Sequence, residues 1–288
     1  YPYYGKTGMR YETNPEPVRL YHVSKGSHSL WHGGKPYAAN ASSLNGRYLV
    51  ALGGDRQIEV WDVIAGRLVG EMTMPSDPSL NGCFGLAVSN DGRYVAWSRQ
   101  KVDSPVTLVP HIWETSLGKI RKLDGENRAY FFAFRPGDSL LLGVHHSPSG
   151  TWGIGAWDLG FELRPRFSTR HLATVICVAH DGSIMATANF WDHVRLLDLE
   201  SGLSSNWNYE GPFIARLSLA FSHDDQRLFS SEDDGGIRLT DVKTGETRML
   251  LPNEGGPVLS LVVDPEGLWM ASKSSEEDLR IWHFGSET

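Results

Sequence analysis

Residues 49–68, LVALGGDRQIEVWDVIAGRL, hold a strand–turn–strand unit from which the whole chain can be read. Two apolar, alternating runs flank a Gly-Gly-Asp-Arg turn, and the second run ends in the pair Trp61-Asp62. An Ala-Gly turn follows and leads to the next apolar run. Alternation of this kind predicts β-strands, and tight glycine turns join antiparallel neighbours. The stretch therefore predicts antiparallel β-sheet, and helical periodicity is absent along the chain.

The pair that ends the second strand marks each copy of this unit. Before each marker come an apolar strand, a turn rich in Asn, Asp, Gly or Pro and a second apolar strand, as in AVSNDGRYVAW at 87–97. A period of about 40 to 45 residues with an aromatic-acid pair predicts four-stranded propeller blades. The markers recur at intervals of 40 to 52 residues and are Tyr21-His22, Trp61-Asp62, Trp113-Glu114, Trp157-Asp158, Leu197-Asp198, Thr240-Asp241 and Trp282-His283.

At these residues the chain resembles the WD40-repeat family over nearly its whole length. The phrases VAHDGSIMATANFWDHVRLLD (178–198) and AFSHDDQRLFSSEDDGGIRLTD (220–241) carry most of the likeness and are similar to the divergent repeats common in bacterial WD40 proteins. The resemblance implies an all-β propeller of four-stranded antiparallel blades, in one domain over residues 1–288. Seven markers favour seven blades with incomplete first and last blades. In the six-blade alternative, residues 27–31 supply the outer strand of the last blade.

The chain departs from the family pattern in one respect. The Gly-His pair of the family is missing from most repeats, so the Asp-His-Ser/Thr-Trp hydrogen-bond tetrad cannot form in full. Thr187, Ser231 and Ser272 keep its hydroxyl positions. We therefore expect the blades to depend chiefly on apolar packing, at about 25 cal/mol per Å² of apolar area buried.

Composition restricts the class of partner. The net charge of -7 with dispersed basic residues argues against nucleic acid, and no apolar run approaches the roughly 20 residues of a membrane helix. Cys83 and Cys177 lie far apart among apolar residues, which predicts buried free thiols and, with no signal peptide visible, a cytoplasmic location. Tyr1 is not an initiator Met, which suggests a processed product or a piece of a longer polypeptide.

In propellers of this family, the loops between strands b and c and between d and a share one face, and they are the default binding surface. Phe190 and Trp191 are aromatic residues at a loop tip and are candidate interface anchors; the alternative is that a ring folds back over the blade edge. Acidic and basic loops predict a charge-split rim that orients a partner, unless they are ordinary solvated charge. The candidate partner-binding residues are Asp55, Arg56, Arg99, Lys101, His145, Trp152, Phe190, Trp191, Glu232, Asp233, Asp234 and Glu276.

Catalytic and metal-binding patterns are weak. His145 and His146 are adjacent, and adjacent residues of a strand point to opposite faces, so they rarely bind one ion together. The chain has no Gly-x-Ser-x-Gly elbow and no glycine loop before a helix. These observations predict no catalytic residues, no metal and no cofactor.

The sequence therefore predicts a non-enzymatic scaffold that binds protein or peptide partners, with no nucleic acid and no membrane insertion; it carries no signal for the oligomeric state. One alternative is a lactonase-like or other propeller hydrolase, or a small-molecule binder, that uses the central channel. His145, Asp192 and Asp233 would then be its active residues. Another alternative is a sensor or interaction module of a multidomain regulator.

Overall fold

The computed structural model describes residues 16–17, 19–22, 27–30, 36–54, 56–103, 107–123, 128–137, 140–146, 152–160, 165–169, 173–189, 194–206, 216–232, 235–251, 256–264, 266–275 and 279–284. All regular elements in these ranges are β-strands. The chain divides into two compact units. Unit 1 takes Tyr1–Phe134, Ser139–Gly150 and Trp157–Arg164, and unit 2 takes Arg135–Asp138, Thr151–Ala156 and Pro165–Thr288. The expected single domain over residues 1–288 stays a prediction.

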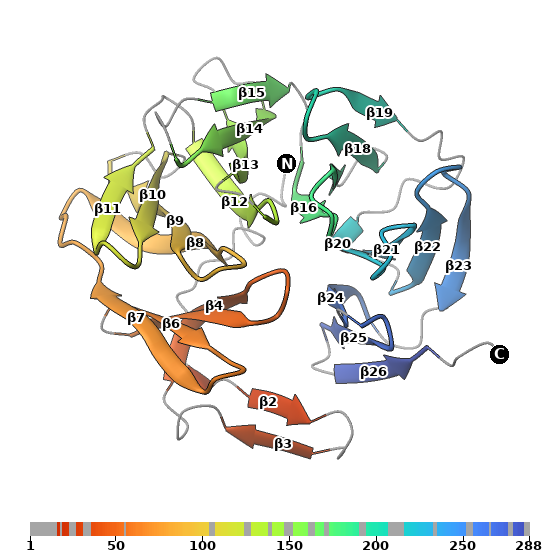
Figure 1. Cartoon of the computed structure of the whole chain (residues 1–288), viewed down its shortest axis with the longest axis horizontal. Helices are drawn as coiled ribbons and strands as arrows, with labels where there is room; N and C mark the ends of the chain where they lie inside the picture. Colours follow the sequence, from red (N-terminus) through yellow and green to blue (C-terminus); the bar gives the residue numbers. More distant parts are fainter. Residues whose placement is uncertain are drawn as a thin grey trace. The chain divides into compact units, whose positions relative to one another are not determined.

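Unit 1 contains two complete larger sheets and a separate hairpin (Figure 1), together with the strands at 128–134 and 140–146 of the next sheet. The first sheet has the order β1-β4-β5-β6-β7 and the second the order β11-β10-β9-β8, while β2 pairs with β3. The strand bounds are β1 Glu16–Pro17, β2 Arg19–His22, β3 Ser27–Leu30, β4 Pro36–Ser42, β5 Tyr48–Gly53, β6 Gln57–Asp62, β7 Arg67–Thr73, β8 Leu80–Val88, β9 Tyr94–Lys101, β10 Leu108–Glu114 and β11 Lys119–Lys122.

The remaining strands form four further sheets in chain order. Their orders are β12-β13-β14-β15, β16-β17-β18-β19, β20-β21-β22-β23 and β24-β25-β26. The first of them takes β12 Arg128–Phe134, β13 Leu140–His146, β14 Trp152–Asp158 and β15 Pro165–Thr169. The others take β16 Val175–Val178, β17 Ile184–Ala188, β18 Arg195–Asp198, β19 Ser204–Asn206, β20 Arg216–Phe221, β21 Arg227–Glu232, β22 Ile237–Asp241, β23 Thr247–Leu251, β24 Val258–Val263, β25 Trp269–Ser274 and β26 Leu279–His283.

The repeat markers coincide with strand ends. Each of the seven predicted pairs forms the last two residues of its strand, namely β2, β6, β10, β14, β18, β22 and β26. Neighbouring strands within a sheet are antiparallel, as in β5 with β6 and β9 with β10. The prediction of an all-β fold made of four-stranded antiparallel sheets is therefore confirmed. The number of blades stays a prediction: the sheet of β26 has three strands among the described residues, and β3 pairs with β2.

A serine and an acid or amide close the turn between the first two strands of several repeats. The Ser89 hydroxyl donates to Asp91 Oδ1 (2.6 Å) and accepts from the Tyr94 amide (2.9 Å). The same pattern recurs at Ser43 with Asn45 and at Ser222 with Asp224. Gly92 sits in this turn at φ +70°, a conformation that favours glycine. The turn residues of the sequence therefore determine where these hairpins form.

Several marker acids cap the following turn with their side chains, as Asp198 and Asp241 show. Asp198 Oδ1 accepts from the Ser201 amide (2.7 Å), and Asp241 Oδ1 accepts from the Thr244 amide (2.8 Å). These hydrogen bonds lower the pKa of both carboxyls, because they favour the charged form. The acids build turns, and this local role accounts for their recurrence.

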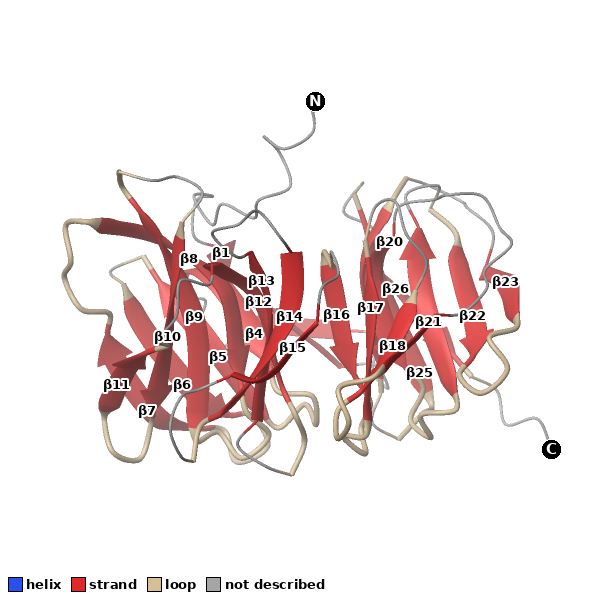
Figure 2. Cartoon of the chain, turned by 90° about the horizontal axis from the view of Figure 1, so that it is seen from above, coloured by secondary structure: helices blue, strands red, loops and turns tan. Residues whose placement is uncertain are grey.

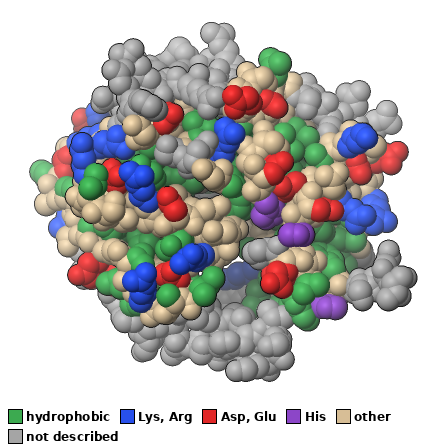
Figure 3. Space-filling model, in the orientation of Figure 1, with side chains coloured by type: hydrophobic (Ala, Val, Ile, Leu, Met, Phe, Trp, Pro, Cys, Tyr) green, Lys and Arg blue, Asp and Glu red, His purple; other side chains and the backbone are tan. Residues whose placement is uncertain are grey.

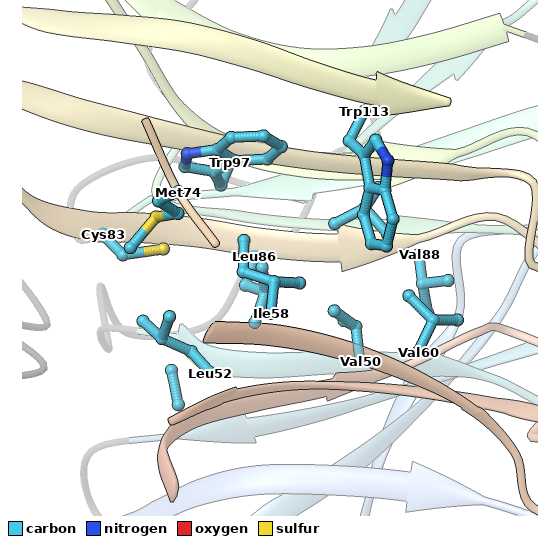
Figure 4. Close-up of a cluster of buried hydrophobic side chains, with 12 residues drawn as sticks. Val50, Leu52, Ile58, Val60, Met74, Cys83, Leu86, Val88, Trp97 and Trp113 are labelled. Atoms are coloured by element: carbon cyan, nitrogen blue, oxygen red, sulfur yellow. The ribbon is translucent and has the colours of Figure 1, made fainter. Parts of the chain in front are cut away.

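Apolar side chains fill the space between the two larger sheets of unit 1. Figure 4 shows Trp97 and Trp113 from the second sheet lying over Val50, Ile58 and Val60 of the first. All five side chains are buried. Packing of tryptophan against branched aliphatic residues is what the sequence predicts for sheets that lack the full tetrad.

The family tetrad survives only in fragments. The Trp282 indole donates to the Ser272 hydroxyl (3.0 Å), which keeps the Ser–Trp half in the last sheet. The strand register places Thr187 at the position equivalent to Ser272, as expected. In the β20–β23 sheet, however, the equivalent residue is Ser230 rather than the expected Ser231, because Leu228 is the partner of the marker Thr240. The sequence assignment of Ser231 was wrong by one residue.

Candidate partner-binding face

The strands of unit 1 end in two different kinds of connection. Figure 2 shows tight turns at one end of its strands and longer connections at the other. We call the first end the turn face. We call the second end the connector face and define it by residues 54 and 56, the connector 74–80 and residues 101–103. Of the residues predicted to bind partners, Arg56 and Lys101 belong to the connector face.

On the turn face, arginine side chains are neutralised by the marker acids. Arg47 Nη2 lies 2.9 Å from Asp62 Oδ2, and Arg93 Nη2 lies 2.7 Å from Glu114 Oε1. Figure 3 shows basic and acidic side chains next to one another on the part of this face that belongs to unit 1. Arg47 and Arg93 are thus paired within the protein.

The connector face is held together by backbone and side-chain hydrogen bonds around residues 74–80. The Met74 amide donates to the Arg56 carbonyl (3.0 Å), and the Val102 amide donates to the Ser79 carbonyl (2.9 Å). Asp77 closes a turn by accepting from the Ser79 amide (3.0 Å) and hydroxyl (2.6 Å), which lowers its pKa. The three segments therefore lie side by side with fixed backbones.

Arg99 lies beneath the connector face and binds the connector 74–80 through its guanidinium. It was expected on an exposed loop, but β9 continues to Lys101 and leaves Arg99 only 4% exposed. Its Nη1 donates to the Pro75 carbonyl (2.9 Å) and its Nη2 to the Leu80 carbonyl (2.6 Å). The expectation of a direct partner contact is thus corrected, because the guanidinium is buried and engaged with the connector.

Arg56 and Lys101 are exposed on the connector face, as predicted for partner-binding residues. Arg56 adopts φ +67°, an uncommon conformation for a residue with a side chain. Lys101 is the last residue of β9, and its amide donates to the Thr107 carbonyl (2.8 Å). Beside it Val102 is 57% exposed. Basic and apolar side chains therefore stand together on this face.

His145 is buried and not part of an exposed loop. Strand β13 extends through His145 to His146, so the loop that follows it is shorter than the sequence indicated. The expected exposure of His145 to a partner is corrected for this reason. Trp152, at the start of β14, lies outside the described side chains.

Several predicted residues lie in segments of the sequence between the described strands. Asp55, Phe190, Trp191, Asp233, Asp234 and Glu276 lie outside the described residues, as do Asp192 of the hydrolase alternative and the side chain of Glu232. The structure therefore brings together Arg56, Arg99 and Lys101 of the predicted set. The split between basic and acidic loops stays a prediction.

The sequence patterns did not single out the connector 74–80 or His111. Two prolines flank Asp77 in the phrase PSDPS (75–79), a pattern typical of a constrained turn, and this signal was available. His111 is buried, stacks on Trp97 with ring centroids 5.3 Å apart, and lies with Nδ1 2.8 Å from the Val109 carbonyl. Burial lowers its pKa to about 4, so His111 is a neutral core residue at neutral pH.

Reactive groups are scarce in the part of the chain that the structure describes. Burial raises the pKa of Cys83 and of Cys177 to about 12, which keeps both thiols protonated at neutral pH. Within the described ranges, no three His, Cys, Asp or Glu side chains converge as metal ligands would. The same ranges contain no helix with the length and apolar character needed to cross a membrane.

Comparisons with known proteins agree with the repeat architecture. The family described as WD domain, G-beta repeat matches residues 206–241. Protein tipD of Dictyostelium discoideum is 24% identical over 273 residues, covering 87% of this chain and 40% of that protein. Striatin-4 of Mus musculus is 36% identical over 94 residues, covering 32% of this chain and 11% of that protein. Autophagy-related protein 16 of Arabidopsis thaliana is 22% identical over 239 residues, covering 80% of this chain and 44% of that protein.

The chain thus spans less than half the length of each of these relatives. A chain in the crystal structure of the mitotic checkpoint complex superposes with a TM-score of 0.69 at 14% identity, over 93% of this chain and 82% of that one. This likeness concerns the fold. Residues 206–241 match a WD40 repeat, and the relatives and the shared fold are similar to WD40-repeat β-propellers.

Proposed function

We propose that this chain is a non-enzymatic scaffold that binds a protein or peptide through its connector face. Members of the WD40 family typically act as protein-interaction scaffolds. The observation that carries the proposal is the structure of the connector face in unit 1. There, exposed Arg56, Lys101 and Val102 stand on a backbone fixed by hydrogen bonds to residues 74–80.

A fixed backbone favours binding because less conformational entropy is lost on association. Arg99 contributes to this without touching a partner, since its two donors hold both ends of the connector. Arginine and apolar side chains together are typical of interface centres. The connector face of unit 1 thus combines a fixed backbone with exposed side chains available for contact with a partner.

The proposal extends, on sequence grounds, to loops outside the described residues. Phe190 and Trp191 are proposed aromatic anchors. The acidic loops that contain Glu232, Asp233, Asp234 and Glu276 are proposed to orient the partner by charge. The cytoplasmic location is likewise a proposal from the sequence.

Two properties of the described residues support a non-enzymatic role. His145, the residue suspected in a hydrolase, is buried in β13, and both cysteines have raised pKa values. The other residues suspected in a hydrolase, Asp192 and Asp233, are not described by the structure. Scaffold binding is therefore the function that the described residues favour.

Site-specific photo-crosslinking tests the proposal. A photo-reactive amino acid replaces Val102 on the connector face in one variant and Leu117, which is 68% exposed in a turn-face loop, in the other. Both variants are irradiated in cell lysate and their adducts are identified by mass spectrometry. We expect one discrete protein adduct from position 102 and none from position 117. Adducts from position 117 alone, or from neither, would contradict the proposal.

A further inference from the structure

We propose that the connector face of unit 1 binds an acidic segment of its partner, with Arg56 and Lys101 contacting the carboxylates. This inference rests on the proposed scaffold function and adds the chemistry of the partner. It starts from a difference between the two faces of unit 1. On the turn face Arg47 and Arg93 are paired within the protein, whereas Arg56 and Lys101 on the connector face and Arg99 beneath it have no ion-pair partner among the described residues.

The turn face shows the paired case. Arg47 and Arg93 each donate two hydrogen bonds to a marker acid, through Nε and Nη2. Each guanidinium also lies over an aromatic ring, at 5.3 Å from the Tyr48 centroid and 5.0 Å from the Tyr94 centroid. These contacts fix the side chains and leave little attraction for an external anion.

The connector face shows the opposite case. No ion pair joins Arg56, Arg99 or Lys101 to another residue in the described ranges. Arg99 lies within electrostatic reach of both Asp77 and Arg56: burial lowers its pKa most, the Asp77 charge raises that pKa, and the Arg56 charge lowers it. Two like charges held near each other attract an anion more strongly than either does alone.

Two described carboxylates lie near these cations. Asp77 accepts both Ser79 donors through Oδ1, and its Oδ2 lies 3.8 Å from Nζ of Lys122. Asp103 is exposed at the end of the same segment as Lys101. When Arg99 beneath this face and Lys122 beside it are counted with Arg56 and Lys101, four cations stand against the carboxylates Asp77 and Asp103 among the described residues. A segment that carries carboxylates would complement this excess of positive charge.

The backbone conformation of Arg56 indicates a role for its side chain. At φ +67° a glycine or asparagine is the usual residue, and Gly53 and Gly54 occupy the same turn. Its amide donates to the Gly53 carbonyl (3.1 Å) and its carbonyl accepts from Met74, so the conformation is fixed by both neighbours. An arginine kept in a conformation that costs it energy suggests selection for the guanidinium.

An apolar surface beside the charges defines the segment further. Val102 is 57% exposed, and Pro75 and Pro78 are exposed on the connector that its amide binds through Ser79. The proposed segment therefore carries carboxylates with an apolar residue among them. The carboxylates would orient it and the apolar residue would bury Val102.

Fluorescence anisotropy with a defined probe tests the inference. The probe is a short labelled peptide of glutamates around one leucine, and its counterpart has glutamine in place of each glutamate. The intact 288-residue chain is titrated with both. We expect binding of the glutamate peptide that weakens as salt is raised, because exposed charges are screened. Arg56→Asn and Lys101→Gln should each weaken it about two- to fivefold. Asparagine tolerates the backbone of position 56, so the first change removes charge and keeps the turn.

Two controls make the outcome decisive. Lys119→Gln removes one exposed positive charge from the turn face and should leave affinity unchanged. Arg56→Lys keeps the charge and should retain most of the binding. Equal binding of the glutamine peptide, or an equal loss in Lys119→Gln, would overturn the inference. Crosslinking from position 102 separates the two proposals: an adduct that persists at wild-type yield in Arg56→Asn/Lys101→Gln retains the scaffold function and rejects the acidic segment.

Discussion

The indole of Trp61 donates its hydrogen bond to the carboxylate of Glu59, two residues earlier on the same strand, with 3.0 Å between Nε1 and Oε2. The hydroxyl of Tyr37 donates to the same oxygen at 2.7 Å. All three side chains are buried. In the last sheet, Trp282 uses a serine hydroxyl from the neighbouring strand instead. The first sheet thus satisfies its marker tryptophan with a buried carboxylate.

Glu59→Ala should destabilise the protein by about 2–6 kcal/mol. The change removes the acceptor of two buried donors, and each buried donor without its acceptor costs about 1–3 kcal/mol. Chemical denaturation followed by tryptophan fluorescence measures the loss. Glu71→Ala is the matched control, because Glu71 pairs with Glu59 in the strand register but is exposed on β7. A loss in Glu71→Ala as large as that in Glu59→Ala would show that the effect is one of sheet propensity.

Tyr37 should make stability fall at alkaline pH. Burial, followed by the hydrogen bond to Glu59, raises the pKa of Tyr37 above its ordinary value of 10.0. The folded state therefore keeps the proton while the unfolded state loses it, so this contribution is complete below pH 10 and declines as pH rises above it. Unfolding free energies measured on both sides of pH 10 should show a smaller decline in Tyr37→Phe. An identical decline in both proteins would assign the effect to other groups, such as Tyr94, whose pKa is raised in the same direction.

Gly92→Ala should be markedly more destabilising than Gly46→Ala. Both glycines have φ near +70°, so both changes carry the same backbone cost of about 1 kcal/mol. A Cβ at position 92 would lie 2.6 Å from the Tyr48 ring, whereas none of the described atoms lies within 4 Å of one at position 46. The clash adds about 1–3 kcal/mol. Thermal denaturation of the two variants measures the difference, and equal losses would mean that Tyr48 moves aside freely.

Arg99→Ala should loosen the connector 74–80 without unfolding the sheets. The change removes both donors to the Pro75 and Leu80 carbonyls. Arg99→Lys should not restore the connector, because one ammonium group cannot reproduce the two directed N–H groups of a planar guanidinium. Hydrogen exchange with mass spectrometry should show faster exchange in peptides that cover residues 74–80. Unchanged exchange there, or equal acceleration in β5 and β6, would contradict this role.

The sequence predicted the strands because each repeat is defined by residues that lie close together in the chain, namely alternating apolar residues followed by turn residues. The markers of β6, β10 and β18 end their strands where the alternating pattern stops and the turn acids begin. The candidate site was predicted less well, because loop positions depend on how far a strand continues. Strands β9 and β13 extend past the turn signals, which buries Arg99 and His145. Burial of this kind depends on strand pairing and on packing between segments distant in sequence, so no local pattern reports it.

Arg56→Gly should separate stability from binding at the connector face. Glycine adopts φ +67° without steric cost, so the variant should be about 0.5–1 kcal/mol more stable than the parent chain in chemical denaturation. It also lacks the guanidinium and should bind the glutamate peptide as weakly as Arg56→Asn. A gain in stability with loss of affinity is the pattern expected where a strained residue is retained for its contacts. A variant that is more stable and binds as well as the parent would show that the Arg56 side chain has no part in recognition, and partner contacts would then have to come from Lys101 and Val102.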